Sequence, residues 1–294
     1  MKKISVLLVM FVAAAITVLG TACSNSASTP SIPSTPSTPS TPSTPTYLGT
    51  KAPSEPKEVG DIVFNDGSAM AYTDFAALSD EEKNAKKASA IALIFYKGTG
   101  LNSGDDTTTS RTLGVGLKHS DKIRWCWNFE KALNKNITTI QCPASESAGG
   151  LTFTGDRNGS DNFEQIGAFL KASEEGVDDT SEVGKYRYPV FYFTKNYSST
   201  ATNLGTSYAS GWYLPSSAEL FQIYACRADT TNGFNIDAAS ETLGGDKFDS
   251  KKYWSSSQSD VVDRGVYLLY FETGSFGNNW GKNNEFYACC VREF

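Results

Sequence analysis

The residues best suited to chemistry in this sequence are its six cysteines and its one histidine. Cys23 stands apart, because it follows a run of residues without charge and two small residues, Thr21 and Ala22, and precedes a polar segment. A bacterial signal peptidase cleaves before such a cysteine, and the new N-terminal residue is then diacylated, with palmitate among the acyl groups. We therefore expect Cys23 to be the lipidated residue that anchors the mature chain.

The remaining five cysteines show no metal-binding or catalytic spacing. Five is an odd number, so at least one thiol is free or pairs with another molecule. No pair has Cys-x-x-Cys spacing, and because His119 is the single histidine, a Cys/His zinc site is nearly excluded. A loop closed by the first two of them and a set of buried free thiols are both compatible with the sequence. The five are Cys126, Cys142, Cys226, Cys289 and Cys290.

Enzyme mechanisms find little support in the sequence. His119 would have to be the base of any Ser/His or Cys/His mechanism, but it lies in a polar, turn-like segment and no Gly-x-Ser-x-Gly motif is near it. No spacing singles out a pair of carboxylates for glycoside hydrolysis. Residues Asp156–Asp161 place oxygen ligands at alternate positions, like the start of a calcium loop, but the required Glu is displaced, so an Asx turn is favoured. We expect no enzyme and no cofactor; structural calcium stays an alternative, and metal ligands are unknown.

Three segments must position these residues: a signal peptide at 1–22, a Ser/Thr/Pro-rich tether at 23–57 and a globular domain at 58–294. The chain starts with two lysines and then runs from Ile4 to Gly20 without charge, as secretion signals do. A simple secretory signal or an uncleaved anchor is the alternative, although the run is short for a bilayer span of roughly 20 residues. The tether repeats Ser-Thr-Pro and is expected to populate polyproline II, at roughly 3.1 Å per residue.

The domain is expected to be α+β, with short, mainly antiparallel strands, two or three helices and long loops. The chain has a formal net charge of −6 and no Lys/Arg cluster remains in the domain, so nucleic acid is a poor partner. Strands are predicted at 60–64, before an Asp-Gly turn, and at 90–96, 188–193, 266–271 and 286–292. Helices are predicted at 79–89, capped by Ser79 and Glu82, and at 162–174 and 216–227.

Three motifs in the last third of the chain occur in an order known from one family. The first is Gly-Trp-x-Leu-Pro-x-x-x-Glu-Leu at Gly211–Leu220, the second is Tyr-Trp-Ser-Ser-Ser at Tyr253–Ser257, and the third is Cys-Val-Arg at Cys290–Arg292. Together they resemble C-type-lectin-fold domains of the formylglycine-generating-enzyme type, and more closely the variable proteins of diversity-generating retroelements. The strand segments at 60–63 and 91–96 extend the resemblance more weakly.

The resemblance implies a surface-anchored binding protein with a variable region at about 254–294, where a reverse transcriptase introduces substitutions at template adenines. Burial of Trp254, Leu268, Val291 and either Tyr270 or Phe271 would fix the sheet, while alternate residues face solvent. Tyr, Asn, Ser and Gly on such a surface suit ligand recognition. The expected ligand contacts are Asp260, Val262, Asp263, Arg264, Tyr267, Glu272, Phe276, Asn278, Asn279, Trp280, Asn283 and Asn284, with Trp280 as a core residue and the Asn pairs as turn residues the alternative.

The expected partner is a protein or other surface ligand, including one on another cell. The expected location is the outer membrane, held by the N-terminal lipid and facing the exterior. Adjacent Cys289 and Cys290 would face opposite sides of a strand, which argues against the cysteine-pair chemistry of distant enzyme relatives. An invariant adhesin-type or structural surface lipoprotein of the same fold is the alternative function.

Overall fold

The structure is a computed structural model that describes residues 46–104, 106–128, 130–134, 157–173, 182–228, 234–259 and 263–294. All of these belong to one compact unit, Pro45–Phe294. The expected signal peptide, Cys23, Cys142 and residues 23–45 of the expected tether lie outside the described residues. Among the helices that the structure describes, none is both long and apolar enough to cross a membrane.

The largest sheet has five antiparallel strands in the order β10-β4-β3-β1-β2. As predicted, the first two strands form a hairpin, and its turn contains Gly67, whose φ of 85° suits glycine. The apolar run that begins at Ala90 is buried through Phe95, as expected for a strand covered on both faces. The strands are β1 Asp61–Phe64, β2 Ala69–Ala71, β3 Ala90–Gly98, β4 Arg111–Gly116 and β10 Val291–Glu293.

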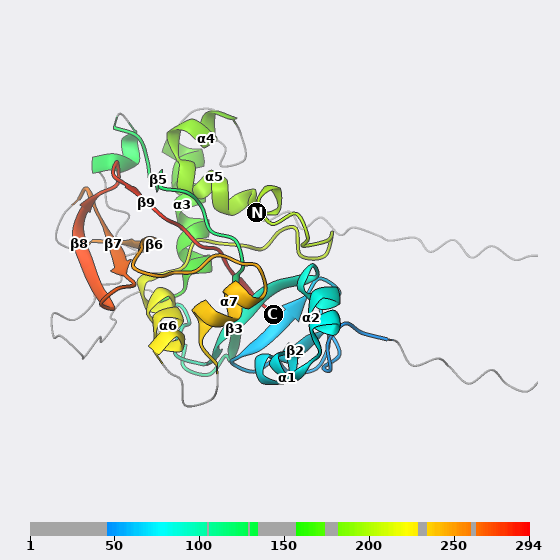
Figure 1. The fold of residues 1–294 in the computed structure, drawn as a ribbon. Helices are drawn as coiled ribbons and strands as arrows, with labels where there is room; N and C mark the ends of the chain where they lie inside the picture. The colour runs from blue at the N-terminus through cyan, green and yellow to red at the C-terminus, as the bar shows by residue number, and fades with distance from the viewer. Residues whose placement is uncertain are drawn as a thin grey trace, which may run out of the picture. The chain divides into compact units, whose positions relative to one another are not determined.

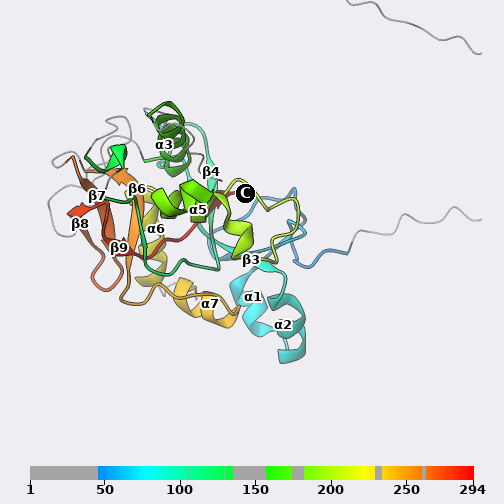
Figure 2. The same ribbon diagram turned by 90° about the horizontal axis from the view of Figure 1, so that it is seen from above.

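A second, three-stranded sheet in the order β6-β7-β8 is built from the C-terminal part of the chain. Figures 1 and 2 show it at the opposite end of the unit from α1 and α2. Strands β5 and β9 form a two-stranded antiparallel ladder in which Ile123 pairs with Phe286. In the sequence, each of them falls between a strand of the large sheet and a strand of the three-stranded sheet. The strands are β5 Ile123–Arg124, β6 Lys252–Gln258, β7 Gly265–Tyr270, β8 Ser275–Gly281 and β9 Glu285–Phe286.

Seven α-helices are described, more than the two or three expected. The additional ones are short, with six or seven residues each, and have too few turns to show an apolar period. The predicted capping box of α2 is confirmed, with Ser79 and Glu82 bonded reciprocally. The helices are α1 Tyr72–Ala77, α2 Asp80–Lys87, α3 Gly159–Ser173, α4 Glu182–Arg187, α5 Pro189–Lys195, α6 Ser217–Ala228 and α7 Ile236–Thr242, with 3₁₀ turns at Lys131–Asn134 and Tyr197–Ser199.

Three sequence predictions about segments are wrong. The apolar residues at 188–193 form helix α5 rather than a strand, because Pro189 occupies its first position, where a missing N–H is tolerated. The single strand expected at 286–292 is two strands, β9 and β10, in different sheets. The tether was expected to continue to 57, but Lys51 already pairs with Ala69 by backbone hydrogen bonds and with Asp61 by a salt bridge.

Two apolar clusters form the core, and they meet at the C-terminal strand. Cys289 belongs to the larger cluster and Cys290 to the smaller one, so these neighbours face opposite sides, as predicted. Burial raises the pKa of the Cys290 thiol well above its usual value. Both side chains are fully buried, which leaves them no open surface at which to act.

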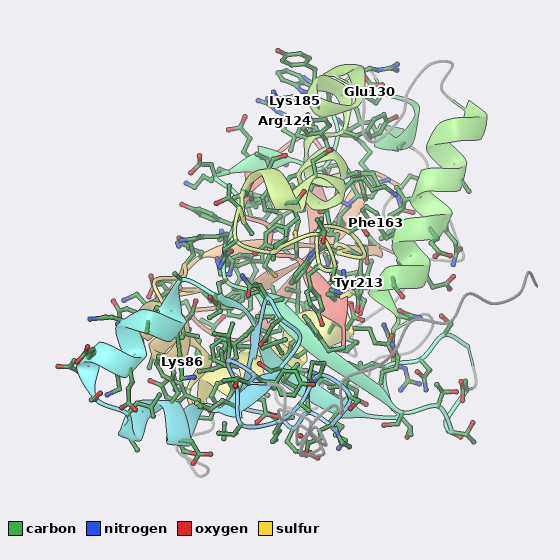
Figure 3. All side chains as sticks on the ribbon, turned by 90° about the vertical axis from the view of Figure 1, so that its right-hand side faces the viewer. Lys86, Arg124, Glu130, Phe163, Lys185 and Tyr213 are labelled. Atoms are coloured by element: carbon green, nitrogen blue, oxygen red, sulfur yellow. The ribbon has the colours of Figure 1, made fainter. Side chains whose placement is uncertain are left out.

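A buried ionic network joins the five-stranded sheet to α6. Glu219, the glutamate of the Gly-Trp-x-Leu-Pro motif, is fully buried, and its carboxylate accepts bonds from Ser216 N at 2.9 Å and Gly159 N at 3.2 Å. Tyr213 OH donates to it at 3.0 Å, and Arg111 lies 3.4 Å away. Figure 3 shows Tyr213 beside the foot of α3. The motif therefore fixes the junction of β4, α3 and α6.

Candidate functional site

The C-terminal sheet that carries the expected ligand contacts has a fixed apolar frame. Trp254, Leu268, Phe271 and Val291 are each fully buried, as expected. Helix α3 holds β6 through a bond from Asn162 to Ser256, and α6 holds it through a bond from the backbone of Ser217 to Ser257. Helices α3 and α6, which are not part of this sheet, therefore hold β6 in place.

The expected contact residues fall mainly on the turns of this sheet and on its edge strand β8. Asp263, Arg264, Glu272 and Asn284 are exposed, and Phe276, Trp280 and Asn283 are half-buried. Asp260 and Val262 lie outside the described residues, as do the side chains of Asn278 and Asn279, whose backbone belongs to β8.

Tyr267 differs from the expectation. It is 3% exposed, and its ring packs edge-on against Phe276. Five of the six positions of β7 are buried, and so are all positions of β6 after the first, so the expected alternation between core and solvent is absent. The reason is that both strands are inside the domain, whereas the alternation applies to a sheet with one wet face.

Trp280 belongs to an aromatic cluster on the outer side of this sheet. Its ring packs edge-on against Phe286, and its indole N–H donates to the hydroxyl of Tyr270. The Lys252 ammonium lies 4.6 Å from the ring centre of Tyr270, 4.8 Å from that of Trp280 and 5.8 Å from that of Phe286. Cation–π attraction holds the lysine over three half-buried rings. Trp280 is therefore part core and part surface.

Asn283 and Asn284 form the turn between β8 and β9. Asn284 N and its side-chain amide both bond to the carbonyl of Gly281 at 2.9 Å, a role that turns commonly give to asparagine. The Asn283 side chain donates to Asn128 at 2.6 Å, which ties the turn to the loop after β5. The turn interpretation of this Asn pair is supported, and both side chains retain some exposure.

Lys282, which the sequence analysis did not select, anchors the same sheet from inside. Its side chain is fully buried, and its ammonium donates to the carbonyls of Ala132 at 2.7 Å and Asp263 at 3.2 Å. It also lies 5.1 Å from the ring centre of Trp125. Burial lowers its pKa to about 8. A lysine in a run of Asn and Gly reads as a solvated turn residue, so nothing in the sequence marked it.

A groove is lined by residues of the α4–α5 segment and of the β5–β9 ladder. It consists of two hollows of about 660 and 410 Å³ that share Lys122 and Glu285 in their walls. We call it the basic groove. Its cationic side chains are Lys122, Arg124, Lys185, Lys251 and Lys252, and its acidic ones are Asp121, Asp249 and Glu285.

The walls of the basic groove are held by specific bonds. Trp127 N donates to the carbonyl of Arg187 at 3.0 Å, and the Arg187 guanidinium donates to Glu130 at 2.7 Å, which joins α4 to the loop after β5. Arg124 stacks over the Trp127 ring at 4.0 Å and pairs with Glu285 at 2.7 Å. Figure 3 shows Arg124, Lys185 and Glu130 gathered at one end of the unit.

His119 lies at the inner wall of the groove. Its ring Nδ1 is 2.7 Å from the hydroxyl of Tyr253, and its ring also packs against Phe248. Burial lowers the pKa of His119 to about 3, so the ring is neutral at neutral pH. It was expected in a polar turn; the structure instead makes it a packed, hydrogen-bonded core residue.

The segment considered as a calcium loop behaves as an Asx turn in its described part, 157–161. Asn158 accepts bonds from the backbone N of Ser160 at 3.1 Å and from its hydroxyl at 2.7 Å. Asp161 accepts bonds from Ser103 and Gln165, and the Asn158 amide donates to the same Ser103 hydroxyl at 3.1 Å. Within the described residues, no group of three or more His, Cys, Asp or Glu side chains could hold a metal ion.

Comparison with known proteins gives a similarity of fold. No protein-family model and no curated protein matches the chain. Among solved structures, the chain is similar to a fimbrial protein from Bacteroides ovatus ATCC 8483, with 15% identity and a TM-score of 0.52. The similarity covers 81% of this chain and 49% of that one, so the chain spans about half the length of its structural neighbour. At this identity the likeness concerns the fold alone, and the chain is accordingly a mixed α+β protein with antiparallel sheets.

Proposed function

We propose that this protein is a surface lipoprotein that binds ligands through the turns and edge of its C-terminal sheet, with a C-type lectin-like fold and a region diversified by a retroelement. The observation that carries the proposal is that residues 254–294 include both buried residues that hold the backbone and exposed residues on turns. Buried Trp254, Leu268 and Phe271 hold the backbone, while Asp263 and Glu272 stand exposed on the turns. Exposed turn residues can change at little cost in stability.

The fold part of this proposal is supported by the placement of the three motifs. The Gly-Trp-x-Leu-Pro segment leads into α6 with Trp212 and Leu214 buried, the Tyr-Trp-Ser-Ser-Ser segment is β6, and Val291 and Arg292 begin β10. Tyr213 and Val291 exchange backbone hydrogen bonds of 2.9 Å, so the first and third motifs are in direct contact. The anchor part rests on Cys23 and the uncharged run before it.

The test of diversification is to sequence the codons from Trp254 to Phe294 and the flanking locus in several isolates. The proposal expects a nearby reverse-transcriptase gene, a template copy of the region, and substitutions at template adenines that fall on exposed turn residues such as Asp263 and Glu272. Substitutions at Trp254, Phe271 and Val291, or a locus without any template, would contradict the proposal.

The anchor is tested separately by growing expressing cells with labelled palmitate. The wild-type protein should carry the label in the membrane fraction, and the Cys23→Ser variant should not. Label on the Cys23→Ser variant, or none on the wild type, would refute lipidation at this residue.

A second function is favoured by the structural neighbour, which is a fimbrial protein. In this version the domain is an adhesin-type or structural surface component with an invariant C-terminal sheet. Identical sequences from Trp254 to Phe294 in all isolates would favour it over the diversified binder.

A further inference from the structure

The basic groove has a charge opposite to that of the whole chain. Among the residues that the structure describes, five cationic and three acidic side chains line its two hollows, whereas the chain has a formal net charge of −6. Walls that carry one excess sign of charge concentrate ligands of the other sign. Two adjoining hollows that share Lys122 and Glu285 favour a ligand that is long rather than compact.

The groove also collects exposed aromatic rings. Among the described residues, four large hydrophobic side chains are exposed, and two of them, Trp127 at 39% and Tyr186 at 66%, line the groove. Half-buried Tyr192 and Tyr287 add further ring surface to its walls. Exposed flat rings with polar groups around them leave apolar area that a bound ligand would cover.

We propose that the basic groove binds an acidic oligosaccharide, such as a chain containing uronic acids. The C–H faces of sugar rings carry slight positive charge and pack on the negative faces of aromatic rings such as Trp127 and Tyr186. The ammonium groups of Lys122 and Lys185 pair with sugar carboxylates.

The acidic side chains of the groove favour binding of an acidic oligosaccharide over binding of other anions. Asp121, Asp249 and Glu285 can accept bonds from sugar hydroxyls, which a carboxylate does well. DNA and an acidic peptide such as polyglutamate also carry negative charge, but they offer these three carboxylates no hydroxyl at each residue.

The site goes beyond the proposed function. None of the expected ligand contacts whose side chains the structure describes lines either hollow, although Lys252 and residues 285–287 of the C-terminal part of the chain do. Its walls come mostly from residues 119–127, 185–200 and 249–252, and from 285–287.

The test is a binding measurement on the full mature chain with a defined panel of probes. The acidic probes are oligogalacturonate, hyaluronan oligosaccharides and oligoalginate; fully methyl-esterified oligogalacturonate is the matched neutral probe, and polyglutamate and single-stranded DNA are the competing anions. The proposal expects at least one acidic oligosaccharide to bind about tenfold more tightly than the neutral, peptide and DNA probes, with affinity falling as salt rises from about 0.05 to 0.5 M.

Variants place the binding in the groove. Trp127→Ala, Tyr186→Ala and Lys122→Glu should each weaken acidic oligosaccharide binding by about tenfold. Tyr47→Ala, which removes an equally exposed ring outside the groove, and Lys83→Glu on α2 are the matched controls and should bind as the wild type does. Because Tyr186 is largely exposed, Tyr186→Ala should fold normally even if Trp127→Ala fails to fold.

Three results would overturn the proposal: no acidic oligosaccharide of the panel binds, the neutral, peptide or DNA probe binds at least as tightly, or the groove variants bind like the controls. The Cys23 experiment does not involve this groove, and the codon experiment scores exposed turn residues such as Asp263 and Glu272, which do not line it. Failure here therefore leaves the proposed function standing, and the reverse also holds.

Discussion

Arg111 and Lys282 are both cations buried in this domain, and the two regions around them neutralise the charge in different ways. Arg111, at the junction of the large sheet and α6, is 4% exposed and faces carboxylates, 3.4 Å from Glu219 and 3.1 Å from Glu293. Lys282, under the C-terminal sheet, donates to the backbone carbonyls of Ala132 and Asp263. Arg111 also donates to the carbonyl of Leu101, but two carboxylates face its charge, whereas the two described hydrogen bonds of Lys282 go to backbone carbonyls.

The difference matters where side chains are expected to change. The carbonyl of Asp263 accepts the Lys282 bond whatever side chain residue 263 carries. The junction at Arg111 has no such tolerance, because replacing Glu219 leaves a buried cation with one fewer partner. A lysine bound to carbonyls therefore suits a region that must vary, and an arginine bound to carboxylates suits a frame that must not.

The largest expected effect is that of Arg111→Met, which leaves the Glu219 carboxyl buried without its cation and should lower the free energy of unfolding by about 3–5 kcal/mol. Burial raises the pKa of Glu219 to about 7, above its ordinary value of 4.5, so the folded state holds the proton more tightly and stability is lost as pH rises from 4.5 through 7. Denaturant unfolding at pH 5 and pH 8 should therefore show the larger loss at pH 8. An equal loss at both would mean that Glu219 does not change its protonation state between pH 5 and pH 8 in the wild type.

Lys282→Met should be less damaging, at about 1–3 kcal/mol, because it leaves two carbonyls unsatisfied but no buried charge. The measurement is the same denaturant unfolding at pH 7, with Lys83→Met on exposed α2 as the control. If Lys282→Met proves as destabilising as Arg111→Met, the contrast between the two regions does not hold.

His119→Gln should lower stability at neutral pH, because the ring contacts with Phe248 and Tyr253 are lost, and should also change the acid sensitivity of the domain. The folded pKa, about 3, lies below the ordinary 6.5, so the unfolded state takes up the proton first and stability is lost as pH falls from 6.5 through 3. Between pH 6 and 4 the wild type should lose about 1.4 kcal/mol per pH unit more than His119→Gln does. Parallel pH profiles of the two proteins would show that His119 is protonated without unfolding.

Asp263→Ser should have the smallest effect, under about 0.5 kcal/mol, because the side chain is exposed and the backbone carbonyl that holds Lys282 remains. Leu268→Ala, in the adjacent strand β7, is the contrasting control and should cost about 2–5 kcal/mol. A loss of several kcal/mol for Asp263→Ser would show that residue 263 is part of the frame.

The sequence predicted the parts of the fold that carry their own local signals. The capping box of Ser79 and Glu82 predicted α2, and the Gly-Trp-x-Leu-Pro segment predicted α6. The apolar residues at 188–193 were misassigned because a buried strand and a buried helix of this length have the same composition, and Pro189 at the first helical position decided between them.

The sites were less predictable than the helices. Exposure of Asp263 and Glu272 could be expected from their turn-like surroundings, but burial of Tyr267 depends on the structure packed around β7. The basic groove could not be predicted, because Trp127, Tyr186 and Lys252 come from three distant segments that only the tertiary fold brings together. Lys282 was hidden for the same reason.

Because β10 lies near the C-terminal end of the sequence, the large sheet can be completed only after nearly all residues of this sequence have been synthesised. Residues 291–293 pair with β4, and Val291 also bonds to Tyr213, so the large sheet lacks one of its members until these residues have been made. If the chain is exported as proposed, it would lack this closing strand for most of its passage through the export channel. A copying error that shifts the reading frame anywhere before Val291 would leave the sheet unfinished. Only copies translated in the correct reading frame through β10 would then complete the sheet.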